Sequence, residues 1–125
     1  MKIVLLDHKA ISWNKLYVQT HWSERQAMAK GIHNFVAATT YQIRKRKITG
    51  LVDVFITAYY TDKRHRDSDN IAAKLYIDGL RDILEGDDTR YIRLIGLQTK
   101  IGQKENRVEI EIKRIKSNLN QPLVV

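Results

Sequence analysis

The sequence predicts an α+β fold, in which a mixed β-sheet of about four strands packs against two main helices. Two observations carry this prediction. Four segments have the apolar pattern of strands and two have apolar residues at helical spacing, in the order β-α-β-α-β-β. The chain has 125 residues, 43% of them hydrophobic and 29% charged, which suits one domain with its own core. We expect that domain to span residues 1–116, followed by a loosely held C-terminal extension at 117–125.

The first half of the chain is predicted to contain a strand, a long loop and the first helix. Residues 2–6 form the apolar strand, and residues 7–22 mix aromatic and polar side chains as a loop would. Ser23 is expected to open the helix, because Ser23 and Gln26 form a capping box in which each side chain satisfies a free backbone N–H group. The helix is expected to end in the basic run 44–47, which the negative end of the helix dipole favours.

The second half is predicted to contain the centre of the sheet and the second helix. The β-branched and aromatic run 51–60 is typical of a central strand. Residues 69–84 carry apolar side chains at helical spacing and predict a helix. Residues 91–101 and 107–115 predict two more strands, joined by a short turn as a hairpin.

Charge and composition limit the possible functions. Lysine and arginine number 22 and aspartate and glutamate 14, so the net charge is +8, which attracts nucleic acid unless it only keeps the protein soluble. The absence of cysteine excludes disulfides, thiolate metal sites and cysteine nucleophiles. No apolar run is long enough to predict a membrane span or a secretory signal, so we expect a cytoplasmic protein with no membrane partner.

Carboxylates stand out inside this basic sequence. Asp67 and Asp69 lie two residues apart in a segment rich in lysine and arginine, and Asp88 follows the second predicted helix. Two such charges about 4 Å apart repel by roughly 4 kcal/mol at an effective dielectric constant near 20. A divalent cation removes that repulsion, and Mg²⁺ is commonly held by one or two carboxylates together with water and phosphate oxygens. The spacing therefore suggests a metal site for phosphate chemistry.

Each of these residues also has an ordinary structural interpretation. An aspartate just before a helix is often an N-cap, and two aspartates after a glycine often form a turn. Lys74 and Asp78 lie four residues apart and could be a surface ion pair on a helix. Trp13 and Trp22 are expected to lie in the core or an interface rather than to act as wedges between bases. The metal-site interpretation gains weight only when the acids, the lysine and the basic surface are taken together.

The order of these residues resembles that of the RusA family of Holliday junction resolvases. That family carries the signature D-x-D-N, then K-x-x-x-D-(A/G)-L, then D-D, which here falls on residues 67–70, 74–80 and 87–88. The segment 12–17, with Asn14, resembles the asparagine and aromatic motif near the family's N-terminus. The resemblance covers about residues 12–115 and implies a RusA-like fold. It also implies a homodimeric endonuclease, often carried by phages, that uses Mg²⁺ or Mn²⁺ to cut branched DNA in recombination and repair.

The resemblance assigns catalytic roles to four residues. The metal-holding aspartates fall on Asp67, Asp69 and Asp88, and the catalytic lysine falls on Lys74. Counted from the D-x-D motif, Lys74 comes one residue later than in the best-known family member, where that place would be Ala73. Lys74 is expected to anchor the cleaved phosphate or to stabilise its transition-state charge. The candidate DNA contacts are Asn14, Lys63, Arg64, His65 and Arg66, together with Arg44, Lys45, Arg46 and Lys47.

A helix over residues 69–84 would hold Asp88 far from Asp69. Such a helix is roughly 22–24 Å long, whereas the four residues that lead on to Asp88 span at most about 13 Å. Either the helix is shorter or bent, or Asp88 reaches the site of a second subunit. Two further functions stay open, namely a nuclease for flaps or other branched DNA and a nucleic-acid-binding module without catalysis.

Overall fold

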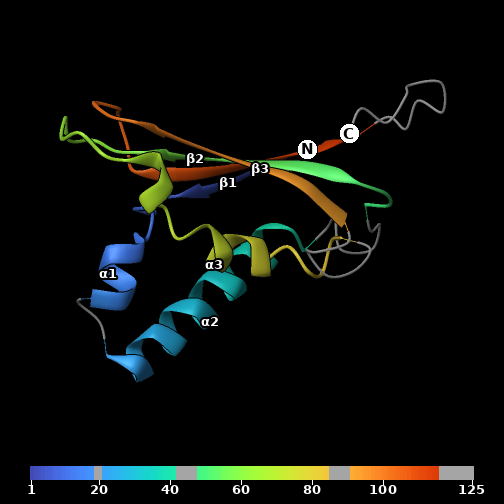
Figure 1. Cartoon of the computed structure of the whole chain (residues 1–125), viewed down its shortest axis with the longest axis horizontal. Coiled ribbons are helices and arrows are strands. Elements are labelled where there is room, and N and C mark those ends of the chain that lie inside the picture. Colours follow the sequence, from blue (N-terminus) through green and yellow to red (C-terminus); the bar gives the residue numbers. More distant parts are fainter. Residues whose placement is uncertain (19–20, 42–47, 85–90, 116–125) are drawn as a thin grey trace, which may run out of the picture.

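The computed structural model describes residues 1–18, 21–41, 48–84 and 91–115 of the chain. These residues form two layers, a sheet and a set of helices that cover one of its faces (Figure 1). The α+β class and the mixed four-stranded sheet are as predicted. In chain order the elements are β1 (Lys2–Leu6), α1 (Trp13–Val18), α2 (Trp22–Thr39), β2 (Val52–Tyr59), the 3₁₀ turn η1 (Ser68–Asn70), α3 (Ala73–Asp78), β3 (Ile92–Lys100) and β4 (Arg107–Arg114).

The order of strands in the sheet is β1-β4-β2-β3. β2 runs parallel to β3 and antiparallel to β4, while β1 runs antiparallel to β4. The predicted hairpin of the last two strands is therefore wrong, since β2 lies between them. The turn between β3 and β4 crosses the end of β2, where the N–H of Gly102 donates to the carbonyl of Asp62 and that of Gln103 to the carbonyl of Tyr60. The largely apolar strand β2 thus has a neighbouring strand on each of its edges, as β4 does.

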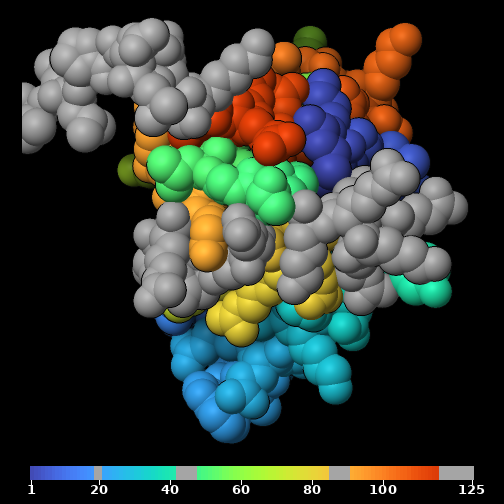
Figure 2. Space-filling model, turned by 90° about the vertical axis from the view of Figure 1, so that its right-hand side faces the viewer, coloured from blue at the N-terminus to red at the C-terminus, as the bar shows by residue number. Residues whose placement is uncertain are grey.

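The core lies between the sheet and the helices. Every second side chain of β2 is fully buried, and β4 and β1 contribute their own alternating apolar residues. This alternation explains why the segments form strands with one wet face and one dry face. Two residues of α2, Ile32 and Val36, are buried against this face together with three residues of α3. Space-filling atoms show the same two layers, with the first turns of α2 (light blue) projecting at the end farthest from the sheet (Figure 2).

The first long helix, α2, begins one residue earlier than predicted. His21 is its N-cap, and the ring Nδ1 of His21 accepts a hydrogen bond from the backbone N–H of Ser23 at 3.3 Å. The predicted capping box of Ser23 and Gln26 is therefore wrong, because an imidazole takes the place of the serine hydroxyl. A short helix, α1, also occupies part of the predicted loop at residues 7–22. The predicted end of the first long helix in the run 44–47 is also wrong, because α2 ends at Thr39 with Thr40 as its C-cap. The run 44–47 itself, residue Asp88, and the predicted boundary at residue 116 with its extension lie outside the described residues.

The second main helix, predicted over residues 69–84, is wrong in its extent. The segment forms η1, then an extended link at Ile71 and Ala72, and then the six residues of α3. Ile71 pairs with Ser12 as an isolated bridge, and the N–H of Ala72 donates to the carbonyl of Ile11 at 2.8 Å. These contacts with the N-terminal segment use backbone groups that a continuous helix would need for itself. The apolar spacing correctly predicted which side chains are buried, but the segment that carries them is not one continuous helix.

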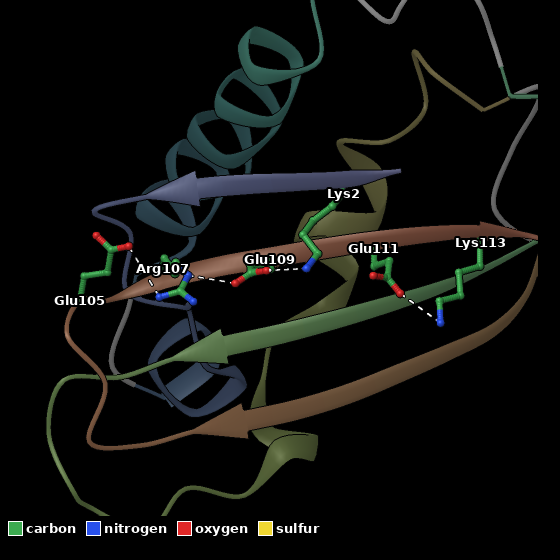
Figure 3. Close-up of polar contacts among 6 residues, drawn as sticks. All are labelled: Lys2, Glu105, Arg107, Glu109, Glu111 and Lys113. Atoms are coloured by element: carbon green, nitrogen blue, oxygen red, sulfur yellow. Dashed lines mark hydrogen bonds and ion pairs between the residues drawn. The ribbon is translucent and has the colours of Figure 1, made fainter.

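No helix of the described ranges covers the outer face of the sheet, and this face carries a row of charged side chains (Figure 3). Glu109 of β4 contacts Lys2 at 3.2 Å and Arg107 at 2.9 Å, and Arg107 also contacts Glu105 at 3.6 Å. Glu111 and Lys113 form a further pair at 3.2 Å. Each charge here has an opposite partner on the same or the neighbouring strand. Within the described residues, none of the helices combines the length and apolarity needed to cross a bilayer.

Candidate active site

The loop from Asp62 to Asn70 leaves the end of β2 and carries the D-x-D-N residues. Two contacts fasten it to β3. The hydroxyl of Thr99 donates to the carbonyl of Arg66 at 3.1 Å, and the hydroxyls of Ser68 and Thr99 lie 3.5 Å apart. The loop is therefore held against the C-terminal end of the neighbouring parallel strand. In open sheets of this kind, loops at the carboxyl ends of parallel strands are common places for functional side chains.

Arg66 forms the internal support of this loop. Its guanidinium donates to the carboxylate of Asp62 at 2.7 Å and lies 4.0 Å from the ring centroid of Tyr60. The bond from Arg66 lowers the pKa of the Asp62 carboxyl, which also accepts the N–H of Arg64 at 3.1 Å. The side chain of Arg66 is 22% exposed, and its Nε is buried without a hydrogen-bond partner in the described part of the chain. Arg66, a predicted DNA contact, is thus engaged mainly within the protein.

Asp67 and Asp69 are not used as helix caps. Asp67 occupies the N-cap position of η1, but its side chain makes no capping hydrogen bond, and the N-cap of α3 is Ala72. The carboxylate of Asp67 is 77% exposed, and its Oδ1 lies 3.4 Å from Nε2 of His65. Asp69 is exposed and has no hydrogen bond or ion pair with any residue that the structure describes. The capping alternative therefore does not account for this pair of acids.

A pocket of about 450 Å³ opens beside Asp67. One wall is the loop, with Arg64, Asp67 and Asn70, and the other wall is the N-terminal segment that leads into α1. The two walls meet where the N–H of Asn14 donates to Oδ1 of Asn70 at 3.3 Å, although these residues are 56 positions apart. The structure therefore brings the predicted residues Asn14, Arg64, His65, Arg66 and Asp67 to one place.

The N-terminal wall is anchored from below by a buried tyrosine of α3. The hydroxyl of Tyr76 accepts the backbone N–H of Ile11 at 3.1 Å and lies 2.7 Å from Nε2 of His8. Burial lowers the pKa of His8, which favours the neutral ring as acceptor for the Tyr76 hydroxyl. Burial also raises the pKa of Tyr76, so the phenol keeps its proton. These contacts fix the backbone that presents Ser12 and Asn14 to the pocket.

Three pocket residues were missed by sequence reasoning. Lys9, Ser12 and Lys15 line the same pocket as Asp67. With Arg64 and Arg66, the two lysines give the pocket an excess of positive charge, which attracts a polyanion. Ser12 and Lys15 belong to the segment 12–17 that resembles the family's N-terminal motif, but they were given no role, and Lys9 is an ordinary polar residue of the predicted loop. Only their position on either side of Asn14 could have pointed to them.

Three predicted residues of the described ranges lie outside the pocket lining, and one of them is Asp69, in η1. Lys74, on α3, lines a separate groove between α1, α2 and α3 together with Asp78, and does not line the pocket beside Asp67. Lys63 is exposed at the turn that contains Gly102, also outside the pocket lining. Asp88 and residues 44–47 lie outside the described residues. The structure thus brings the N-terminal segment with Asn14 next to the D-x-D-N loop and separates both from Lys74.

The oxygen atoms at this site are of the type that binds hard divalent cations. Asp67 and Asp69 offer carboxylate oxygens, and neither forms an ion pair with a lysine or arginine among the described residues. Mg²⁺ commonly keeps several waters and takes one or two carboxylates, so a complete protein cage is not required. No cluster of three histidine, aspartate or glutamate side chains capable of holding a metal occurs within the described ranges. These ranges contain two of the three predicted ligands.

Comparison with known proteins gives one informative result. A search of curated proteins found no match. A family model described as Endodeoxyribonuclease RusA matches residues 8–113, which include both walls of the pocket, η1, α3 and strands β2 and β3. The match covers far more than half of the 125 residues. The chain therefore belongs to the RusA family of endodeoxyribonucleases, the resolvases of crossover (Holliday) junctions.

Proposed function

We propose that this protein resolves four-way DNA junctions by paired, symmetrical phosphodiester cuts that depend on a divalent cation, with Asp67 and Asp69 at the cleaved phosphate. One observation carries the proposal. Asp67 lines a basic pocket and Asp69 follows it in the same loop, and both carboxylates are exposed, cap no helix and have no lysine or arginine partner in the described part of the chain. In a protein with a net charge of +8, acids left in this state are available to a ligand.

The carboxylates and the DNA need a cation between them. A phosphate approaching Asp67 would be repelled, since two like charges about 4 Å apart cost roughly 4 kcal/mol at an effective dielectric constant near 20. We propose that Asp67, Asp69 and Asp88 hold Mg²⁺ or Mn²⁺. When bound, such an ion supplies Lewis-acid stabilisation of phosphate charge and lowers the pKa of coordinated water.

The remaining pocket residues are proposed to position the DNA. Because Oδ1 of Asn70 accepts the N–H of Asn14, the amide NH₂ of Asn70 is left as a donor for a phosphate oxygen. Arg64 and His65 are exposed beside Asp67 and suit contacts to neighbouring phosphates. We propose that Arg66 acts through the loop that it supports, and that Lys63 and residues 44–47 extend the DNA footprint.

Lys74 is proposed to contact the same DNA from the neighbouring groove. Helix α1 alone separates the two hollows, since Asn14 and Lys15 line the pocket whereas Trp13 and Tyr17 line the groove. A DNA strand that follows this surface passes Asp67 and then Lys74. Its ammonium group could anchor a phosphate or stabilise charge in the transition state.

We propose further that Asp88 completes the site of a second subunit. Since α3 has six residues, about 9 Å, the length of a helix no longer separates Asp88 from Asp69. Strand β3 now supplies the separation, because Thr99, which holds the loop, lies about 23 Å along the strand from Ile92. The four residues from Asp88 to Ile92 cover at most about 14 Å. A two-fold dimer with shared sites would also present two cuts to a four-way junction.

The deciding experiment is junction cleavage by the wild type and by Asp69→Asn, with and without Mg²⁺. We expect Asp69→Asn to bind a four-way junction within a few-fold of the wild type and to lose metal-dependent cutting. Asp7→Asn is the matched control, because Asp7 is also exposed and its φ of 49° is tolerated by asparagine. Cutting by Asp69→Asn at the wild-type rate would refute the assignment.

A substrate panel separates the proposal from its alternatives. Four-way, three-way, flap and linear DNA are compared at one salt concentration, because affinity for DNA depends strongly on salt. Preference for the four-way junction supports a resolvase, and equal cutting of flaps indicates a broader nuclease. Binding without cutting, at any concentration of Mg²⁺ or Mn²⁺, indicates a binding module.

A further inference from the structure

A second hollow lies on the other side of α1 from the pocket. This aromatic groove has a volume of about 360 Å³ and is formed between α1, α2 and α3. The side chains that matter here are Trp13, Tyr17, Trp22, Arg25 and Lys74. Its volume falls within the range of ligand sites, roughly 300–1,000 Å³. None of the residue roles proposed above, apart from that of Lys74, involves it.

Large aromatic rings are exposed in this groove. Trp22 is 60% exposed and Tyr17 is 59% exposed. The rings of Trp13 and Tyr17 stack with centroids 5.4 Å apart and an angle of 19° between their planes. Leaving a large apolar side chain in water forgoes about 1.5–3 kcal/mol of burial, so a cluster of such rings usually marks a binding surface. Trp22 was expected in the core or in an interface, and its exposure excludes the core.

Cations accompany the rings. The guanidinium carbon of Arg25 lies 5.4 Å from the centroid of the Tyr17 ring, and Lys74 lines the same groove. Asp78 is the only acid in the lining, so positive charge predominates among these described residues. Aromatic faces next to arginine and lysine are typical of sites that bind unpaired nucleotides, where bases stack on the rings and the cations meet phosphates.

The aromatic groove and the pocket beside Asp67 lie on two sides of the same short helix, α1. One side of α1 contributes Asn14 and Lys15 to the pocket, and the other side contributes Trp13 and Tyr17 to the groove. Helix α1 has six residues and a length of about 9 Å. The two hollows are separated across this helix, whose width with its side chains is about 10–12 Å, which corresponds to about three nucleotides spaced roughly 3.4 Å apart. A base in the groove and a phosphate at Asp67 can thus belong to one strand.

We propose that the aromatic groove holds a DNA base that is unstacked at the branch point, about three nucleotides from the phosphate that is cut. Unstacking costs least where a base is already poorly paired, so the groove favours branched over continuous duplex DNA. This inference rests on the proposed junction-cutting function and adds how the branch is recognised. Trp22 and Tyr17 supply the stacking surfaces, and Arg25 and Lys74 balance the charge of the flanking phosphates.

The test uses four-way junctions that carry 2-aminopurine, a fluorescent base, at successive positions around the branch. Binding is measured without Mg²⁺, so that the DNA stays intact. With the wild type, we expect the fluorescence of one position near the branch to change. Trp22→Ala should abolish that change and weaken junction binding by about 5- to 150-fold, which corresponds to roughly 1–3 kcal/mol per stacked base. Its affinity for linear duplex should stay within about two-fold.

Two further variants keep the result interpretable. Trp22→Phe preserves a stacking ring and should retain most of the fluorescence change. Tyr41→Ala is the matched control, because Tyr41 is 63% exposed and follows the opposite end of α2, and it should behave as the wild type. Should Trp22→Ala fail to fold, Arg25→Gln tests the same groove from its rim.

Three outcomes overturn the inference. The first is a 2-aminopurine signal in Trp22→Ala that equals that of the wild type. The second is a loss of junction binding matched by an equal loss of duplex binding. The third is a wild type that shows no change in base fluorescence, while Trp22→Ala changes the oligomeric state. The last would make the groove a protein interface. This test measures binding and no cleavage, so it can succeed or fail independently of the proposed nuclease function. A wild type that shows the base signal but never cuts DNA would refute the nuclease function and leave the groove assignment standing.

Discussion

Acidic side chains are paired with cations on the outer face of the sheet, whereas most of those in the loop from Asp62 to Asn70 are not. On the outer face, charged side chains contact partners of opposite sign along neighbouring positions (Figure 3). Asp53 likewise accepts two hydrogen bonds from Arg93, at 3.0 and 2.7 Å. In the loop, Asp62 is paired with Arg66, whereas Asp67 and Asp69 have no lysine or arginine partner among the described residues. The comparison separates acids that hold the fold from acids that are available for chemistry.

The largest expected effect is on catalysis. Asp67→Asn should lower the single-turnover rate of junction cutting by at least about 100-fold, because loss of several kcal/mol of charge stabilisation costs a factor of ten per 1.4 kcal/mol. Glu111→Gln, on the outer face, should cut at nearly the wild-type rate. A similar loss in both variants would show that the two regions do not differ in function.

Arg66→Ala should have the largest effect on stability. The change leaves Asp62 without its guanidinium partner and uncovers the ring of Tyr60. A lost charge-assisted hydrogen bond in a partly buried place costs about 1–3 kcal/mol, so the midpoint of thermal unfolding should fall by several degrees. Activity should fall as well, since the loop also carries Asp67. An unchanged unfolding midpoint would contradict the supporting role of Arg66.

Acid titration should separate Asp62 from its neighbours in the loop. Arg66 lowers the pKa of Asp62 in the folded state below its value near 3.9 in the unfolded chain. The stability from this pair is therefore present above about pH 4 and is lost as the pH falls through the folded pKa. Thermal melts of the wild type and Asp62→Asn should differ at pH 7 and converge as the pH falls below the folded pKa of Asp62. A difference that persists in acid would point to packing instead of charge.

The smallest effect is expected on the outer face. The ion pair of Lys113 and Glu111 is exposed, and pairs of this kind contribute about 0–1 kcal/mol. Lys113→Met should change the unfolding midpoint by no more than a few degrees and should leave junction cutting unaltered. A larger loss would mean that the charged residues of this face act as one network.

Local patterns predicted the strands well, and they failed where distant segments meet. Alternation located β1 at residues 2–6 and β4 within residues 107–115 because one wet and one dry face leave a period of two in the sequence. The helix over 69–84 and the hairpin were wrong because Ile71 pairs with Ser12, and because β2 inserts between β3 and β4. No local spacing records such pairings.

The same limit applies to the candidate site. The D-x-D-N motif was visible, and its resemblance to a known family led to Asp67, Asp69 and Asn14. Lys9 and Lys15 join the pocket only because Tyr76 anchors the N-terminal segment against α3. The separation of Lys74 from that pocket depends on where the helix breaks after Ile71. Tertiary contacts decide both positions.

The contact between Asn14 and Asn70 also has a consequence for timing. Its two halves are translated 56 codons apart, and the second wall is fixed only once β3 is present to hold the loop through Thr99. The two walls of the pocket are therefore brought together only in a chain that contains both the N-terminal segment and β3.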